Sequence, residues 1–274
     1  MIPVHAPATL PEGPLGRVAA FGGIYSNHVA LAAAIADARA RRVDAILCLG
    51  DLGAFGPHPD KVFPLLREAG IPVVRGNYDD SIAQGLDDCQ CGYTDARDNY
   101  YARLSYQYTF SNTSEENRSW MAGFPTEIRF RLGDLEVLAC HGSPRQMNEF
   151  LWESATPTHF LDMLAHNAGT DVIIGTHTGI HWKRQLAEDR WYVNVGALGR
   201  PANDGRTEVW YTILEADGRG LHVEFVPVSY DYEALAGEME DERLPDEFVQ
   251  TIRTGYWTTC LEILPAKERA RGLF

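Results

Sequence analysis

The chain has 274 residues, of which 45% are hydrophobic, and a formal net charge of −14 at neutral pH. This length can bury a sizeable core, and the absence of linkers, repeats and low-complexity tracts favours a single domain over 1–274. The acidic balance opposes stable binding to nucleic acids or to anionic lipid, because such binding rests on Lys and Arg neutralising phosphates.

Apolar strands alternate with amphipathic helices along the chain. In chain order, the pattern predicts strands at 17–22, 45–49, 72–74, 135–140 and 172–174, helices at 27–40, 60–68, 114–121 and 158–168, an antiparallel hairpin within 191–225, and two helices around 245. Strand, helix, strand, helix at this spacing is a βαβ unit. We therefore expect a mixed α/β (α+β) fold with a core over about 17–226 and a helical extension over 231–274.

The stretch 87–113 is polar and rich in tyrosine. Its aromatic rings could line the mouth of a site and stack on a planar group. The alternative, which we favour, is that they pack a cap segment onto the domain, because aromatic side chains more often bury area than bind ligands.

The cysteine count bears on the compartment. Five cysteines, an odd number, argue against the disulfide framework of a secreted protein. Cys89 and Cys91 are the one suggestive pair, and we expect two reduced loop thiols there because no second pair accompanies them. The amino end lacks a signal-peptide pattern and no apolar run approaches membrane-spanning length, so we expect a cytoplasmic protein.

Four of the apolar runs end on a residue that can bind a metal. These residues are Asp51, Asn77, His141 and His177. Apolar runs that end on such residues are typical of parallel strands, and the functional side chains of parallel sheets lie just beyond the carboxyl ends of the strands. One carboxylate, one amide oxygen and two imidazoles suit a divalent transition ion such as Mn, Fe, Ni or Zn better than Mg or Ca. The sequence therefore predicts a metal site at this edge of the sheet.

Several segments together resemble the calcineurin-like metallophosphoesterases, and most closely the bacterial branch of small phosphodiesterases and phosphatases. The segments are LGDLGAFGPHPDKVFPLLREAGIPVVRGNYDD, CHGSPRQMNEFL, IIGTHTGIHW and YVNVGALGRP, and with the flanking chain they cover roughly residues 17–215 in the family's order. The resemblance implies a four-layer α/β/β/α sandwich that holds two metals at its strand ends. It also implies hydrolysis of phosphomonoesters, phosphodiesters or nucleotides.

The resemblance implies a complete ligand set for one of the two metals. In the family, that metal is held by the aspartate of a GD motif, the asparagine of a GNH motif, a mid-chain histidine and the first histidine of a GHxH motif. These positions are Asp51, Asn77, His141 and His177 here. All four ligands are present.

The second metal lacks every ligand that belongs to it alone. The aspartate and histidine of the family's opening D-x-H align with Gly23 and Tyr25, and the last histidine of GHxH aligns with Gly179. This pattern favours one ion over two. A rebuilt second site could use Tyr25 and His181, but we favour the alternative in which Tyr25 fills the space that the lost ligand has left.

Other pocket residues follow from the same alignment. The GNH histidine, which helps to protonate the leaving group, is Tyr78 here, so we assign catalytic roles to Tyr78 and to the metal ligand Asp51. A phenol with a pKa near ~10 is a poorer general acid at neutrality than an imidazole near ~6.5, although it still donates a hydrogen bond. Arg145 suits bidentate phosphate recognition, with a surface charge as its alternative. Asn27 could present its amide to a phosphate or cap the first helix.

Two functions remain open at this point. The complete ligand set favours a metal-dependent hydrolase acting on a small phosphorylated molecule or a nucleotide. The altered positions favour a weak or inactive module that binds a metal, a phosphate or a nucleotide in the same pocket. A partner-binding scaffold is a third and weaker hypothesis.

Overall fold

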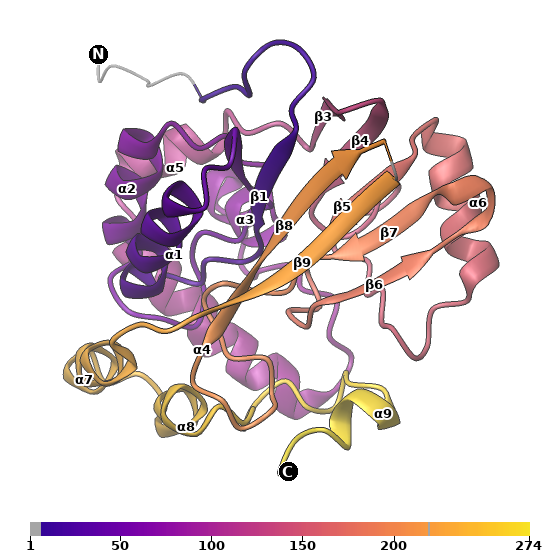
Figure 1. The fold of residues 1–274 in the computed structure, drawn as a ribbon. Coiled ribbons are helices and arrows are strands. Elements are labelled where there is room, and N and C mark those ends of the chain that lie inside the picture. The colour runs from indigo at the N-terminus through magenta and orange to yellow at the C-terminus, as the bar shows by residue number, and fades with distance from the viewer. Residues whose placement is uncertain (1–6, 219) are drawn as a thin grey trace.

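Two β-sheets pack face to face between layers of helices (Figure 1). The computed structural model describes residues 7–218 and 220–274, so residues 1–6 and Arg219 lie outside the described part. The strands are β1 (Arg17–Phe21), β2 (Ala45–Cys48), β3 (Glu127–Leu132), β4 (Leu135–Cys140), β5 (Val172–Gly175), β6 (Trp182–Gln185), β7 (Trp191–Asn194), β8 (Val209–Asp217) and β9 (Gly220–Val228). The first sheet has the order β2-β1-β8-β9, and the second has the order β3-β4-β5-β7-β6.

Helices cover the outer faces of both sheets. They are α1 (His28–Ala40), α2 (Val62–Ala69), α3 (Asn77–Gln84), α4 (Ala96–Asn112), α5 (Glu115–Met121), α6 (Thr158–Ala168), α7 (Tyr232–Asp241), α8 (Asp246–Thr254) and α9 (Ala266–Arg269). Figure 1 shows α1, α2, α3 and α5 on the side of the first sheet and α6 beyond the second. The predicted four-layer α/β/β/α sandwich is confirmed.

The core follows from the two-residue period of the strands. In β1, Val18 and Ala20 face the second sheet and join an apolar cluster with residues of β4, β5 and β7. The alternate residues Ala19 and Phe21 face α1 and α2 in a second cluster. A third cluster packs Ile173 and its neighbours against α6. Three apolar layers therefore hold the four structural layers together.

Most predicted elements are present, one predicted strand is wrong, and two strands and three helices (α3, α4 and α9) are additions. β1 pairs parallel with β2 in the first sheet, and β4 and β7 each pair parallel with β5 in the second, so the parallel strands of each sheet end at the same edge of that sheet. The predicted strand at 72–74 is wrong: it forms only an isolated bridge between Val73 and Cys48. Pro72 has no N–H to extend the ladder. The strands β3 and β6 were not predicted. Among the described residues, none of the helices has the length and apolarity that crossing a bilayer would require.

Candidate metal centre

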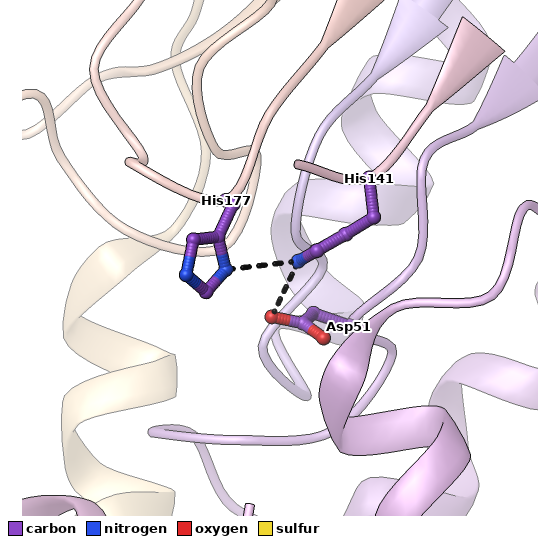
Figure 2. A group of neighbouring side chains, drawn as sticks. All are labelled: Asp51, His141 and His177. Atoms are coloured by element: carbon purple, nitrogen blue, oxygen red, sulfur yellow. Dashed lines mark hydrogen bonds and ion pairs between the residues drawn. The ribbon is translucent and has the colours of Figure 1, made fainter. Parts of the chain in front are cut away.

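Three of the predicted ligands meet where the strands end. Asp51 follows β2, His141 follows β4 and His177 follows β5. The His141 Nε2 atom lies 3.3 Å from Asp51 Oδ2 and 3.3 Å from His177 Nδ1, as Figure 2 shows. One ligand atom from each residue lies within 4.8 Å of the others, and all three side chains are buried. This is the spacing of ligands around a single ion.

The backbone holds these side chains in place. The Leu49 carbonyl oxygen lies 2.6 Å from His141 Nδ1 and accepts a hydrogen bond from its N–H group. This leaves the Nε2 atom to bind a metal. The Tyr78 amide at the start of α3 donates to Asp51 Oδ1 at 3.0 Å. Asp51 and His177 both adopt left-handed backbone conformations, with φ of 54° and 55°. Non-glycine residues hold such conformations where the surrounding structure enforces them, often at functional sites.

Asn77 lines the same pocket and has a free oxygen. Its Nδ2 donates to the Cys89 carbonyl at 2.8 Å, whereas its buried Oδ1 has no hydrogen-bond partner within the described part of the chain. An unpartnered buried acceptor is costly, and a metal ion would satisfy it. The donor set of one carboxylate, one amide oxygen and two imidazoles fits a divalent transition ion.

The loop that orients Asn77 corrects one prediction. Cys89 and Cys91, expected as reduced thiols, form a disulfide in the structure. The intervening residue Gln90 has a φ of 50°, and this turn brings the two sulfurs together. Cys91 also lines the pocket. Residue spacing alone did not reveal this turn.

The electrostatics of the site favour an ion pair between Asp51 and His141. Burial acts to raise the pKa of Asp51, but the His141 and His177 imidazoles lower it below its usual range. Burial acts to lower the pKa of His141, and the Asp51 carboxylate more than reverses this. Burial, with the neighbouring His141, lowers the pKa of His177 to about 3, so its imidazole is neutral and can donate a lone pair.

Asp79 ties the Asp51 loop to the start of α3. Its Oδ2 accepts from the Asp51 and Gly76 amides at 2.8 and 2.9 Å, and its Oδ1 accepts from the Leu52 amide at 3.0 Å. Burial, followed by the charge of Asp51, raises its pKa to about 7. Gly76 is required here, since a Cβ atom would lie 2.3 Å from Asp51 Oδ1. The two ligand-bearing segments therefore pack as one unit.

Aromatic rings lie against Gly23 and Gly179, the two glycines at which the family resemblance places ligands of a second metal. A Cβ atom on Gly23 would lie 2.4 Å from the Tyr25 ring. A Cβ atom on Gly179 would lie 3.4 Å from the ring of Trp257, which belongs to the carboxyl-terminal extension. Gly179 also has a φ of 74°, which disfavours any side chain there. This geometry agrees with the hypothesis that Tyr25 fills a vacated space.

Tyr78 lines the pocket, but its hydroxyl is engaged elsewhere. It donates to Ser105 Oγ of α4 at 3.1 Å. Burial is the main cause of the raised pKa of Tyr78, although Ser105 acts in the opposite direction. The phenol is therefore protonated at neutral pH, and it must leave Ser105 before it can donate to a substrate.

The remaining predicted site residues lie elsewhere or serve the fold. Asn27 caps α1 through Oδ1, which accepts from the Ala30 amide, and its Nδ2 donates to the Gly199 carbonyl. Arg145 pairs with Glu149 and does not line the pocket that contains Asp51. His181 packs between Trp210 and Phe225, with ring centroids at 4.5 and 4.6 Å, and does not line that pocket either.

The pocket that contains Asp51, Asn77 and His177 is partly lined by aromatic rings. It is a small cavity of about 60 Å³. The aromatic residues that line it are Tyr25, Phe55, Tyr78, Tyr93, Tyr101 and Phe248. Tyr93 and Tyr101 come from the tyrosine-rich stretch, whereas Tyr106 and Tyr108 of that stretch bond to Leu86 and Glu242 and hold α4 in place. The stretch therefore packs onto the domain, as favoured, and two of its tyrosines also reach the pocket, whereas stacking on a planar group stays a prediction.

Arg200 also lines the pocket, and our sequence analysis missed it. It follows β7 within the segment YVNVGALGRP, at the same sheet edge as the ligands. That position after a parallel strand was the signal that could have revealed it.

The family comparisons agree with this geometry. The model of the calcineurin-like phosphoesterase superfamily domain matches residues 21–219. An uncharacterized protein of Methanocaldococcus jannaschii, MJ0912, is 27% identical over 245 residues, which cover 84% of this chain and 94% of that protein.

Two solved structures share the fold. A metallophosphoesterase from Sphaerobacter thermophilus is 25% identical with a TM-score of 0.67, and a hypothetical protein, PH1004, from Pyrococcus horikoshii OT3 is 19% identical with a TM-score of 0.73. Each match covers 88% of this chain and 99% of the other.

Proposed function

The chain belongs to the calcineurin-like phosphoesterase superfamily, and from that premise we propose that it is a metal-dependent phosphoester hydrolase. The substrate would be a small phosphorylated molecule or a nucleotide. The observation that carries the proposal is the convergence of Asp51, His141 and His177 beside the unpartnered oxygen of Asn77. These four residues would hold one divalent ion, for which Mn, Fe, Ni and Zn are the candidates.

The protein's own residues would prepare the substrate for reaction. When bound, the ion would polarise the phosphoryl group and acidify a water molecule. The buried ligands exclude bulk water from this point, which strengthens each electrostatic contact. The aromatic walls supply apolar surface for an aryl group or a nucleobase.

The proposal of a single ion rests on the two aromatic rings that lie against Gly23 and Gly179, where the family resemblance places ligands of a second metal. The Tyr25 ring lies where a side chain of residue 23 would begin, and Trp257 lies against Gly179. Metal analysis of the purified chain should find one tightly bound ion per chain, and two would count against this part.

A screen of aryl phosphomonoesters and bis-aryl phosphodiesters with each candidate metal tests the activity. We expect metal-dependent turnover that falls to background in Asp51→Asn, because the carboxylate ligand is lost while the side-chain shape is kept. Asp80→Asn is the matched control, since its carboxylate pairs with Arg75 outside the site. Turnover by Asp51→Asn at the wild-type rate would refute the assignment.

A second candidate function is a binding module without significant turnover. Two observations favour it: the Tyr78 hydroxyl is held by Ser105, and aromatic rings lie against both glycines at the second-metal positions. No turnover with any candidate metal, together with measurable binding of a nucleotide, would select this alternative.

A further inference from the structure

Arg200 is a buried cation without a counter-ion. Its side chain is 7% exposed, and among the described residues no carboxylate lies within ion-pair distance of its guanidinium. Nη2 donates to the Thr259 carbonyl at 2.8 Å, and the buried Nε has no acceptor in the described ranges. A buried charge without a partner is strongly unfavourable. Such a group calls for an anion that is not part of the chain.

Aromatic packing fixes where the guanidinium lies. Its central carbon lies 3.9 Å from the centroid of the Trp257 ring and 5.0 Å from that of Phe55. A guanidinium packed against two rings and bonded to the Thr259 carbonyl has little rotational freedom. Arg200 is therefore held in one orientation before any ligand arrives.

Arg200 shares its pocket with the metal ligands. Asp51, Asn77 and His177 line the same cavity. Trp257, on which Arg200 stacks, is the same ring that lies against Gly179. The guanidinium thus lies on the side of the site where the second-metal ligands are missing.

We propose that Arg200 binds the phosphoryl oxygens of the substrate, supplying from the protein a positive charge beside the single metal ion. The inference rests on the proposed function in taking a phosphate ester as the ligand. A guanidinium forms charge-assisted hydrogen bonds to two phosphate oxygens at once, and low exposure strengthens them. Arg200 takes the role that the sequence assigned to Arg145, whose own charge is paired with Glu149.

Binding of inorganic phosphate tests the proposal without requiring turnover. Phosphate is titrated calorimetrically into the full chain with saturating Mn²⁺ and again in EDTA. Arg200→Met removes the charge and keeps an apolar side chain on Trp257. We expect it to weaken phosphate binding by about 10- to 100-fold, which is the loss of one charge-assisted contact. The affinity for Mn²⁺ measured without phosphate should be unchanged, because Arg200 is not a ligand.

The matched control is Arg206→Met. Arg206 also stacks on a tryptophan, Trp210, but it is paired with Asp204 and does not line the pocket. Its loss should leave phosphate affinity unchanged. If Arg200→Met does not fold, Arg200→Gln carries the same test, since it removes the charge and keeps a donor for Thr259.

The outcomes separate this inference from the proposed function. Equal phosphate affinity in the wild type and in the charge-removing variant overturns the role of Arg200, even if metal-dependent turnover is found. Absence of phosphate binding by the wild type with Mn²⁺ also overturns it. Arg200-dependent binding without turnover supports the inference and refutes the hydrolase.

Discussion

The contacts of Asp79 predict a large effect for a change of one atom. Asp79→Asn replaces a carboxylate that accepts from three buried amides, those of Asp51, Leu52 and Gly76. An asparagine has one side-chain oxygen. If this oxygen keeps the hydrogen bonds from the Asp51 and Gly76 amides, the NH₂ group points at the Leu52 amide. If the oxygen keeps the bond from Leu52, the other two hydrogen bonds are lost. At least one buried donor is left without an acceptor.

The size of the effect follows from that count. An unsatisfied buried donor costs about 1–3 kcal/mol, so Asp79→Asn should lower the free energy of unfolding by at least that amount. Asp79→Ala leaves three such donors, about 3–9 kcal/mol by the same rule. That range overlaps the total stability of an ordinary domain, about 5–15 kcal/mol, so the asparagine variant is the informative one.

Urea unfolding in EDTA at pH 8 measures the effect, since the Asp79 carboxylate is ionised above its pKa of about 7. The control is Asp80→Asn on the same helix, whose partly exposed carboxylate accepts from Arg75 and Gln84. Such partly exposed contacts are worth about 0–1 kcal/mol. We also expect weaker metal binding by Asp79→Asn, because Asp51 and Asn77 lose their shared support. Equal destabilisation by the two variants would refute the reasoning.

Three further predictions use the same structure. Gly23→Ala should cost about 1–3 kcal/mol of stability through overpacking, and the cost should vanish in a Tyr25→Ala background, as a double-mutant cycle in urea would show. His181 has a folded pKa of about 4, lowered mainly by burial, below its unfolded value. The contribution of the neutral His181 imidazole to the free energy of unfolding is complete above the pKa of an unfolded histidine, ~6.5, and is lost as pH falls towards the folded pKa. Between pH 7 and pH 5, the free energy of unfolding of the wild type should therefore fall by about 2 kcal/mol more than that of His181→Phe. Arg145→Gln should leave the affinity for phosphate unchanged in calorimetry, since Glu149 already neutralises Arg145.

Parallel strands and their ends were predictable from the sequence for a physical reason. A strand buried on both faces must be apolar throughout, so β2 and β5 appear as uninterrupted apolar runs, and β4 as an apolar run with one exposed charge, Glu136, near its start. The first polar residue after such a run lies at the sheet edge. This logic places Asp51, His141 and His177 together without knowledge of the fold, and their convergence in the structure agrees with it.

The two edge strands of the second sheet were missed because one of their sides faces solvent. β3 (EIRFRL) alternates apolar and charged residues, whereas β6 (WKRQ) has a single apolar residue followed by three polar ones. Their patterns are too short or too polar to distinguish from loops. Local pattern identifies buried strands better than edge strands for this reason.

The parts of the pocket that come from distant chain segments could not be predicted. Phe248, Thr259 and Cys260 line the pocket and lie in the carboxyl-terminal extension, where no local pattern indicates chemistry. They reach the pocket only through tertiary packing of the extension against the strand ends. For Arg145 a local motif did predict chemistry, namely phosphate binding. In the structure its guanidinium forms an ion pair with a neighbouring carboxylate, Glu149, which no motif indicated.

The net charge on the Arg200 side of the pocket equals the one that the family resemblance implies for the second metal and its aspartate. A second divalent ion with its own aspartate would contribute two positive charges less one negative charge. Here the aspartate position is Gly23, and Arg200 contributes one positive charge. A phosphate entering the pocket therefore meets the same net charge from this side, carried by a fixed side chain and not by an exchangeable ion. Affinity for the phosphoryl group can survive such a replacement. The Lewis acidity of the second ion is not replaced, because a guanidinium cannot bind and acidify a water molecule. Substrate binding should therefore be retained better than turnover.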